Sequence, residues 1–180
     1  MEKLIKWEIL GSEKKYQGHI FSCHDVELKT GLGETTTFNV LKTLDWINVV
    51  ATTTDDHILL VKQYRVGTDS FTLETPGGGV NPGEDLLMAA KRELREETGY
   101  DCESIEKLMT VEVNPAFMNN RCHFYWAKNC VEVGELKLDQ FEEIQVIKMP
   151  VSGIKNYLKS GKITHSLVVN ALLLFISHQS

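Results

Sequence analysis

The chain has 180 residues, of which 42% are hydrophobic, and its formal net charge is -6. This hydrophobic share is enough for a packed core and excludes an intrinsically disordered chain. The length favours one domain with a short N-terminal extension. The negative charge argues against general nucleic-acid binding, because phosphate backbones are held mainly by Lys and Arg. We therefore expect no nucleic-acid polymer among the partners.

Cysteine spacing and apolar segments bear on the location of the protein. The 4 cysteines show no CxxC pattern, which favours reduced thiols over zinc or disulfides and predicts a cytoplasmic protein. The segment MEKLIKWEIL lacks the long apolar run of a signal peptide. The apolar stretch LVVNALLLFI is far shorter than the roughly 20 residues that a membrane-spanning helix needs. We expect a packed helix there and no membrane partner.

Alternating and apolar runs predict an α/β fold. Residues 1–40 contain short mixed runs broken by glycines and predict a strand-rich extension. The rest of the chain alternates strand and helix patterns, which indicates a mixed sheet flanked by helices. The predicted strands lie at 46–54, 57–65, 105–115, 121–133 and 143–150, and the predicted helices at 84–98, 151–161 and 165–178.

The helix predicted at 84–98 is the most strongly patterned of these elements. It contains no internal Gly or Pro, and Gly99 is typical of a left-handed helix end. Leu87, Ala90 and Leu94 recur at spacings of three and four, so they predict its apolar face.

The same helix places three carboxylates on one stripe. Glu93, Glu96 and Glu97 share a helix face, because residues three and four apart are neighbours. A solvated charged face is the simpler interpretation. A divalent cation is the alternative, because Mg²⁺ takes oxygen ligands from carboxylates and substrate phosphates.

A glycine-rich stretch upstream decides between these interpretations. Gly77, Gly78 and Gly79 precede a second turn at 81–83, and such a loop lets backbone groups approach a ligand closely. It contains neither GxGxxG nor GK[ST]. Residues 78–100 read G-x5-E-x7-R-E-L-x-E-E-x-G-Y, which resembles the Nudix box at every specified position. This resemblance favours the metal site over the solvated face.

The resemblance to the Nudix family implies a ligand set for divalent ions. Glu93, Glu96 and Glu97 correspond to the metal-binding carboxylates, and Glu97 is also a catalytic candidate. Arg92 corresponds to the arginine that orients these carboxylates. The carbonyl of Gly77 lies where ADP-sugar members of the family commonly add a backbone ligand. The implied cofactor is Mg²⁺ or Mn²⁺, with two or more ions.

The resemblance also implies the architecture around the site. Glu84 corresponds to an outer glutamate that supports the site, and Gly78 and Gly99 to structural glycines. The implied fold is a Nudix-type α/β/α sandwich over residues 41–180, preceded by the strand-rich extension at 1–40.

Segments outside the box resemble the ADP-ribose and nucleoside diphosphate sugar pyrophosphatases. LLVKQYR, followed by LETPGG, is similar to the lead into the box in that subgroup. Pro115 lies sixteen residues beyond Gly99, a spacing associated with the same subgroup. Arg65 is then a candidate for pyrophosphate contact, since its fork suits phosphate oxygens. Pairing of Arg65 with Glu74 is the equal alternative.

Members of this subgroup often carry an acidic loop late in the chain, which supplies a metal ligand or a catalytic base. The corresponding segment LKLDQFEEIQVIKMP is less acidic, and Gln140 stands where some members have glutamate. Glu142 is our candidate for contact with metal or water, ahead of Glu143 and Asp139. An exposed loop carboxylate is the alternative, so the identity of the base stays open.

The implied function is metal-dependent hydrolysis of the pyrophosphate bond of nucleoside diphosphate sugars such as ADP-ribose, giving a nucleoside monophosphate and a sugar phosphate. One alternative is a Nudix hydrolase acting on nucleoside triphosphates, dinucleoside polyphosphates or RNA 5′ ends. Another is a nucleotide-sensing domain without catalysis. The resemblance also implies a homodimer formed through residues 1–40. Trp46 is a candidate for stacking on the nucleobase, and packing in a core or interface is the simpler interpretation of this residue.

Overall fold

The computed structural model describes residues 4–138, 140 and 143–179. The described residues belong to two compact units. One unit lies within Met1–Leu44 and Glu112–Arg121, and the other within Asp45–Val111 and Cys122–Ser180.

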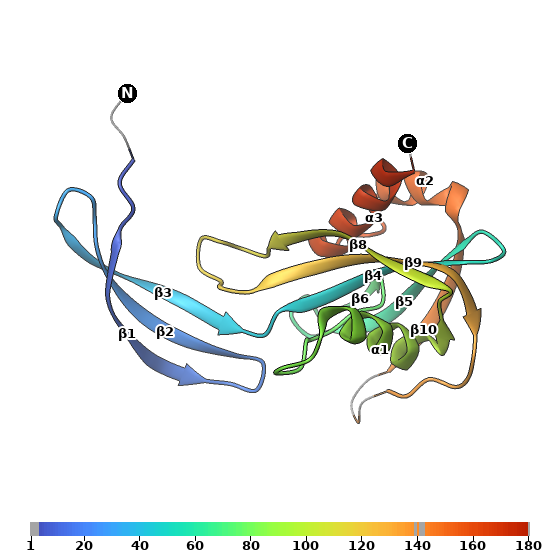
Figure 1. Cartoon of the computed structure of the whole chain (residues 1–180), viewed down its shortest axis with the longest axis horizontal. Helices are drawn as coiled ribbons and strands as arrows, with labels where there is room; N and C mark the ends of the chain where they lie inside the picture. Colours follow the sequence, from blue (N-terminus) through green and yellow to red (C-terminus); the bar gives the residue numbers. More distant parts are fainter. Residues whose placement is uncertain (1–3, 139, 141–142, 180) are drawn as a thin grey trace. The chain divides into compact units, whose positions relative to one another are not determined.

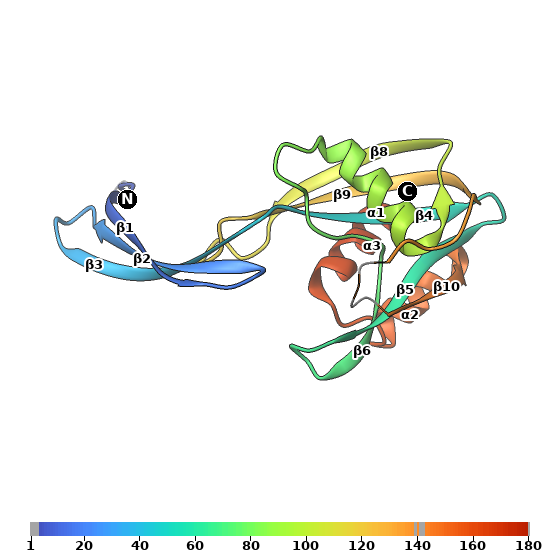
Figure 2. The same cartoon turned by 90° about the horizontal axis from the view of Figure 1, so that it is seen from below.

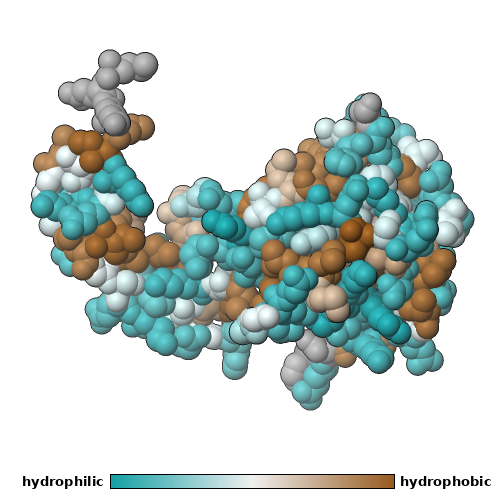
Figure 3. Space-filling view, viewed as in Figure 1, coloured by the Kyte–Doolittle hydropathy of each residue, from teal (hydrophilic) through white to brown (hydrophobic). Residues whose placement is uncertain are grey.

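The smaller unit is an antiparallel sheet with almost no core of its own. Among the described residues of this unit, Val26 is the only hydrophobic side chain that is buried. It pairs across the sheet with the exposed Phe38, and apolar side chains are visible on the surface of this unit (Figure 3). The prediction of a strand-rich N-terminal region is confirmed. The strands, in the order β1-β2-β3, are β1 (Glu8–Gln17), β2 (Phe21–Lys29) and β3 (Thr35–Thr43).

The larger unit is built on a mixed sheet, as the sequence predicts. Its strands are β4 (Trp46–Thr53), β5 (His57–Arg65), β6 (Ser70–Glu74), β7 (Tyr100–Asp101), β8 (Ser104–Glu112), β9 (Arg121–Glu132) and β10 (Ile144–Pro150). Within the described residues the order is β10-β5-β4-β9-β7, with β6 paired to β5 and β8 to β9. β4 and β9 run parallel, whereas β5 is antiparallel to β4, β6 and β10.

Helices cover both faces of this sheet (Figures 1 and 2). Ala90 and Leu94 of the first helix pack in one core with Ile47, Val49 and Ala51 of β4. The last helix contacts β4 from the opposite face. Burial on both faces explains why the residues from Trp46 to Ala51 are apolar apart from Asn48. The helices are α1 (Leu86–Thr98), α2 (Ile154–Lys159), which follows the 3-10 turn η1 (Val151–Gly153), and α3 (Ser166–His178).

Helix α1 begins two residues later than the sequence predicts. Asp85 is its N-cap, with extended dihedral angles (φ -69°, ψ 136°), and its Oδ1 accepts from the N–H groups of Leu87 (3.0 Å) and Met88 (3.1 Å). An aspartate carboxylate satisfies helix N–H groups better from outside the helix than from within it. Glu84 therefore lies in the turn before α1, not on the helix.

The buried face of α1 also differs from the predicted one. Leu87 is 38% exposed, so its assignment to the apolar face is wrong. Ala90 and Leu94 are buried as predicted, but Glu93 and Glu97 share their face. Hydrophobic periodicity assigns inward positions to apolar residues, and here two carboxylates occupy inward positions because polar groups nearby bind them.

Two strands are absent from the sequence prediction. β6 pairs with β5 across a tight turn in which Asp69 takes a positive φ of 48°. β7 contains two residues, Tyr100 and Asp101, which pair with β9. β7 is too short for a period-2 pattern. In β6 the sequence alternates, but hydropathy indicates the wrong face, because Thr72 and Glu74 are buried and Phe71 is exposed.

The apolar segment near the C-terminus forms the packed helix that the sequence predicts. All four cysteines lie within the described residues and are free thiols. In the described part of the chain, no helix is long and apolar enough to cross a membrane. LVVNALLLFI forms part of α3, which packs on the sheet.

The N-cap of α1 yields a stability prediction. We expect Asp85→Ala to lower the free energy of unfolding by about 1 kcal/mol, because two helix N–H groups lose their acceptor. Urea denaturation followed by circular dichroism measures this loss. Lys91→Ala, on the exposed face of the same helix, serves as the control and should change stability by less than about 0.5 kcal/mol. Equal effects of the two substitutions would contradict the capping role.

Candidate active site

The glycine-rich loop before α1 runs beside the first half of β4. In the described register, β4 pairs with β5 at Ala51 and Thr52 alone, so β5 leaves the earlier residues of β4 uncovered on that side. The loop takes its place as an antiparallel neighbour. The backbone hydrogen bonds are Val49 N to Pro76 O (2.8 Å), Ile47 N to Gly78 O (2.8 Å) and Val80 N to Asp45 O (2.9 Å).

Two glycines allow this loop to lie between strand and helix. A Cβ at Gly77 would collide with the carbonyl of Ile47. A Cβ at Gly78 would stand 2.6 Å from Oε1 of Glu93. The structural role predicted for Gly78 thus has a steric basis, since any side chain there would displace a site carboxylate.

Arg92 joins the loop to the carboxylates. Its Nε and Nη2 donate to the two oxygens of Glu84 (2.8 and 2.9 Å). Its Nη1 donates to Oε1 of Glu93 (2.8 Å) and Oε2 of Glu96 (3.1 Å). Nη2 also donates to the carbonyl of Gly79 (3.0 Å). One guanidinium therefore contacts three carboxylates and the loop backbone.

These contacts favour the charged forms of Glu84 and Arg92. The hydrogen bonds from Arg92 hold the pKa of Glu84 at about 2, well below its usual range, and the N–H of Asn81 adds to this effect. In turn, Glu84, followed by Glu93 and Glu96, raises the pKa of Arg92 above its already high value. Opposite charges in hydrogen-bond contact each favour the charged form of the other.

Glu97 is bound by the loop. Its side chain is buried (4% exposed), and its Oε2 accepts from the N–H of Gly77 (2.8 Å). Pro76 and Gly78 direct their carbonyls to β4, so Gly77 faces the other way. Coordination of a metal ion by the Gly77 carbonyl stays a prediction.

The donor chemistry of this cluster fits a divalent cation. Within the described residues, no three His, Cys, Asp or Glu side chains converge as a ready-made metal site. Glu93 and Glu96 are instead held by Nη1 of Arg92. Carboxylate and carbonyl oxygens are nevertheless the ligands that hard divalent cations prefer.

Gly99 ends the helix that carries these glutamates. It takes a left-handed conformation (φ 73°), and its N–H donates to the carbonyl of Arg95. A side chain at this position would meet the carbonyl of Gly134. The loop after β9 also donates to the last turn of α1, from Lys137 N to Glu96 O (2.9 Å). The predicted structural glycine therefore closes α1 against a second loop.

Arg65 is paired with Glu74. Its Nε and Nη2 donate to the two oxygens of the Glu74 carboxylate (2.7 and 2.8 Å), and Thr72 Oγ1 donates to the same carboxylate. Burial by itself raises the pKa of Glu74, but the hydrogen bonds from Arg65 and Thr72 outweigh burial and hold this pKa below its usual range. The pairing weighed as an alternative is therefore observed, and pyrophosphate contact by Arg65 stays a prediction.

The structure describes Trp46, one further predicted site residue, but not Glu142. Trp46 begins β4, is partly buried, and forms a bridge with Gly79 of the glycine-rich loop. This places it next to the site, whereas stacking on a nucleobase stays a prediction. Glu142, together with Asp139, lies outside the described residues.

The structure adds a polar pair that the sequence reasoning does not identify. Asn48 of β4 accepts a hydrogen bond at Oδ1 from Thr75 Oγ1 (2.6 Å). Thr75 directly precedes the segment that pairs with β4. In the sequence, Asn48 stands out as the one polar residue inside the apolar run WINVV. This pattern does not identify Thr75 as its hydrogen-bond partner.

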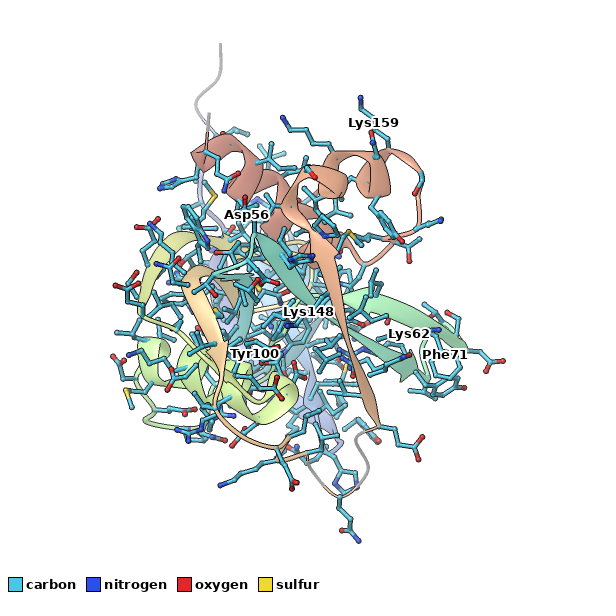
Figure 4. The ribbon with its side chains drawn as sticks, turned by 90° about the vertical axis from the view of Figure 1, so that its right-hand side faces the viewer. Asp56, Lys62, Phe71, Tyr100, Lys148 and Lys159 are labelled. Atoms are coloured by element: carbon cyan, nitrogen blue, oxygen red, sulfur yellow. The ribbon has the colours of Figure 1, made fainter. Side chains whose placement is uncertain are left out.

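A separate hollow of about 560 Å³ lies where β5, β6 and the start of β10 meet. Lys62 and Phe71 lie side by side there (Figure 4), with Nζ 5.4 Å from the ring centroid. No residue of α1 lines this hollow, so it is distinct from the glutamate cluster. Its lining consists of Lys62, Phe71, Leu138, Glu143, Ile144 and Gln145.

Comparison with known proteins identifies the family. The model of the NUDIX domain matches residues 44–167, which is more than half of the chain. A methanol dehydrogenase activator from Bacillus methanolicus is 31% identical over 175 residues, covering 96% of this chain and 94% of that protein. The chain therefore belongs to the NUDIX family, and the prediction made from the box is confirmed.

Other relatives and a solved structure agree with this class. The ADP compounds hydrolase NudE of Escherichia coli (strain K12) is 25% identical over 96% of this chain and 93% of its own length. The ADP-ribose pyrophosphatase of Bacillus subtilis (strain 168) is 24% identical over 89% and 88%. A crystal structure of an ADP compounds hydrolase matches with a TM-score of 0.89 at 24% identity, over 99% of this chain and 96% of that one. The fold is the Nudix fold, and the chain is a Nudix pyrophosphohydrolase. Nudix hydrolases generally use divalent metal ions.

The lowered pKa of Glu84 makes stability depend on pH. A carboxylate whose pKa is about 2 in the folded chain and 4.5 ordinarily stabilises the fold above pH 4.5, and this contribution is lost as the pH falls toward 2. We expect the stability difference between wild type and Glu84→Gln to shrink over that range. Urea denaturation at several pH values between 3 and 7 measures it.

The control for this prediction is the same substitution made in an Arg92→Met background. There the partner that lowers the pKa is missing, so Glu84→Gln should no longer produce a pH-dependent difference. A difference that is constant with pH in the Arg92 protein would refute the assignment.

Proposed function

We propose that this Nudix pyrophosphohydrolase cleaves the pyrophosphate bond of ADP-ribose and related nucleoside diphosphate sugars, giving a nucleoside monophosphate and a sugar phosphate. The observation that carries the proposal is the position of Glu93, Glu96 and Glu97 on α1 beside the glycine-rich loop. Relatives named ADP compounds hydrolase and ADP-ribose pyrophosphatase, which align over most of the chain, support this substrate class.

The three glutamates would hold two or more Mg²⁺ or Mn²⁺ ions, with the Gly77 carbonyl as a further ligand. Such ions neutralise the diphosphate and lower the pKa of the attacking water. Arg92 keeps the ligands in place through its hydrogen bonds to Glu93 and Glu96. It also retains its own charge, because Glu84 binds it from the opposite side.

Two residues outside the box complete the proposal. The half-exposed guanidinium of Arg65, oriented by the buried Glu74, would contact the pyrophosphate oxygens. Glu142, in the late acidic segment, would accept the proton of the attacking water. If so, Glu142→Gln lowers kcat more than Glu143→Gln does.

The direct test is turnover. We expect the protein with Mg²⁺ to release AMP and ribose 5-phosphate from ADP-ribose, and EDTA to abolish this release. Glu97→Gln should lower kcat by at least about 100-fold, comparable to the loss of one key charge-stabilising group. Liberated monophosphate, measured over a panel that includes ADP-ribose, GDP-mannose, UDP-glucose and diadenosine polyphosphates, gives both results.

Glu103→Gln, on the surface of the same unit, is the control and should retain wild-type rates. Tight binding of ADP-ribose without cleavage of any diphosphate in the panel would favour the sensing alternative. A near-normal rate in Glu97→Gln would contradict the metal-ligand assignment.

We also propose that the three-stranded sheet of the smaller unit forms a homodimer. An isolated sheet of three strands needs a packing partner for its apolar face, and this unit has one buried hydrophobic residue among those described. Its aromatic side chains are exposed, and Phe38 lies near Trp7, with ring centroids 6.0 Å apart. A second copy of the chain would cover them. In the larger unit, Trp46 beside the glycine-rich loop would stack on the nucleobase.

Size-exclusion chromatography with light scattering tests the dimer. We expect wild type to have twice the 20.4 kDa chain mass, and Phe38→Lys to shift it to the monomer, because a charge in an apolar interface is costly. Thr37→Lys, at the next position on the opposite face of β3, should remain dimeric. A monomeric wild type at micromolar concentration would exclude the homodimer.

A further inference from the structure

Asn48 occupies a special position relative to the glycine-rich loop. Its neighbours Ile47 and Val49 donate their backbone N–H groups to the loop carbonyls. The antiparallel bridge between Trp46 and Gly79 defines the register of the loop against β4. In this register Asn48 lies opposite Gly77. Asn48 is therefore the β4 residue directly across from the loop residue that binds Glu97.

The amide of Asn48 connects three segments. Its Oδ1 accepts from Thr75 Oγ1 (2.6 Å), at the start of the loop. Its Nδ2 donates to the carbonyl of Ile47 (3.2 Å), the same carbonyl that lies against Gly77. Nδ2 also lies 3.6 Å from Sγ of Cys122 on β9. Burial raises the pKa of the Cys122 thiol to about 12, so this contact involves a neutral sulfur.

The loop needs such a contact because its own sequence does not define its register. Consecutive glycines are conformationally permissive and offer no side chains for packing. Backbone hydrogen bonds alone permit a slip by one residue, and such a slip reverses the side to which every group points. A slip would turn the N–H of Gly77 away from Glu97, to which it now donates. The bond between Asn48 and Thr75 is a side-chain contact formed in the observed register.

We propose that Asn48, acting with Thr75, is a positioning residue for the hydrolysis. It fixes the glycine-rich loop against β4 and so holds Gly77 beside Glu97. It acts through the loop and does not contact the substrate. This inference deepens the proposed function and rests on it for the kinetic part of its test.

The variants for the test are Asn48→Ala and Thr75→Val, which remove the bond from either side, and Thr75→Ser, which keeps the hydroxyl. Thr52→Val is the matched control. Thr52 lies on the same strand, is buried, and has two side-chain hydrogen bonds, to Ala127 O (3.2 Å) and from Trp126 Nε1 (2.9 Å). Thr52 lies beyond the part of β4 that pairs with the glycine-rich loop. Thr52→Val therefore measures what the loss of buried hydrogen bonds elsewhere on β4 does to stability and turnover.

The first measurement is hydrogen exchange of the full-length protein without metal or substrate. We expect peptides that cover residues 77–80 to exchange about tenfold faster in Asn48→Ala and Thr75→Val, in line with the loss of one hydrogen bond that holds the loop. Thr75→Ser and Thr52→Val should exchange like wild type in this segment. Unchanged exchange in Asn48→Ala would overturn the proposal.

The second measurement is steady-state hydrolysis of ADP-ribose with Mg²⁺. We expect kcat to fall about 10- to 100-fold in Asn48→Ala and Thr75→Val, the range for a slightly misplaced catalytic group, with KM changed by less than about threefold. The double variant should be no worse than either single one, because both remove the same contact. Thr75→Ser should recover most of kcat, and Thr52→Val should lose stability but keep kcat.

The outcomes separate the two proposals. A wild type that cleaves no diphosphate refutes the proposed function, and the exchange measurement then still decides whether Asn48 fixes the loop. A wild type that is active, with Asn48→Ala and Thr75→Val indistinguishable from Thr52→Val, refutes the positioning role alone.

Discussion

The ion pairs of Arg92 are the interaction on which the site depends. Three glutamates within five residues of one helix repel one another, and two of them are buried. Burying a carboxylate is costly unless it is paired and hydrogen-bonded. The guanidinium neutralises Glu93 and Glu96, and its bond to the Gly79 carbonyl ties the loop to α1. Without this cation the inward face of α1 would lose the positive charge beside Glu93, and the loop would lose one of its bonds to α1.

Glu84 and strand β4 also hold the glutamates and the glycine-rich loop in place. Glu84, outside the helix, binds Arg92 through both carboxylate oxygens and stays ionised because its pKa is about 2. On the other side, β4 holds the glycine-rich loop by backbone pairing. The loop thus lies between a strand and a helix, and each of its sides has its own set of hydrogen bonds. Each of the three glutamates on α1 is thus held by a protein group, Glu93 and Glu96 by Arg92 and Glu97 by the N–H of Gly77.

The comparison of prediction with structure shows where sequence patterns succeed and fail. The long strands and all three helices follow from periodicity and from glycine positions, because these signals act over many residues. The inward position of Leu87 was wrong, since hydropathy cannot indicate that Glu93 and Glu97 have partners inside. Pairing of Arg65 with Glu74 was one of two equal alternatives. Choosing between them requires knowing that β5 and β6 form a hairpin in which the polar Glu74 is buried, and hydropathy does not indicate a buried carboxylate.

The sequence by itself determined the identity of the site residues. The spacing from Gly78 to Tyr100 fixes which side chains share a helix face and where the helix ends, and both are local properties of the chain. Only the tertiary structure decided what these residues touch. Arg92 reaches Glu84 because Asp85 caps the helix and leaves Glu84 in the preceding turn. Gly77 contacts Glu97, and Asn48 contacts Thr75, because β5 pairs with only the end of β4. The glycine-rich loop pairs with the remaining edge of β4. Contacts between segments distant in sequence depend on sheet order and register, which no local spacing encodes.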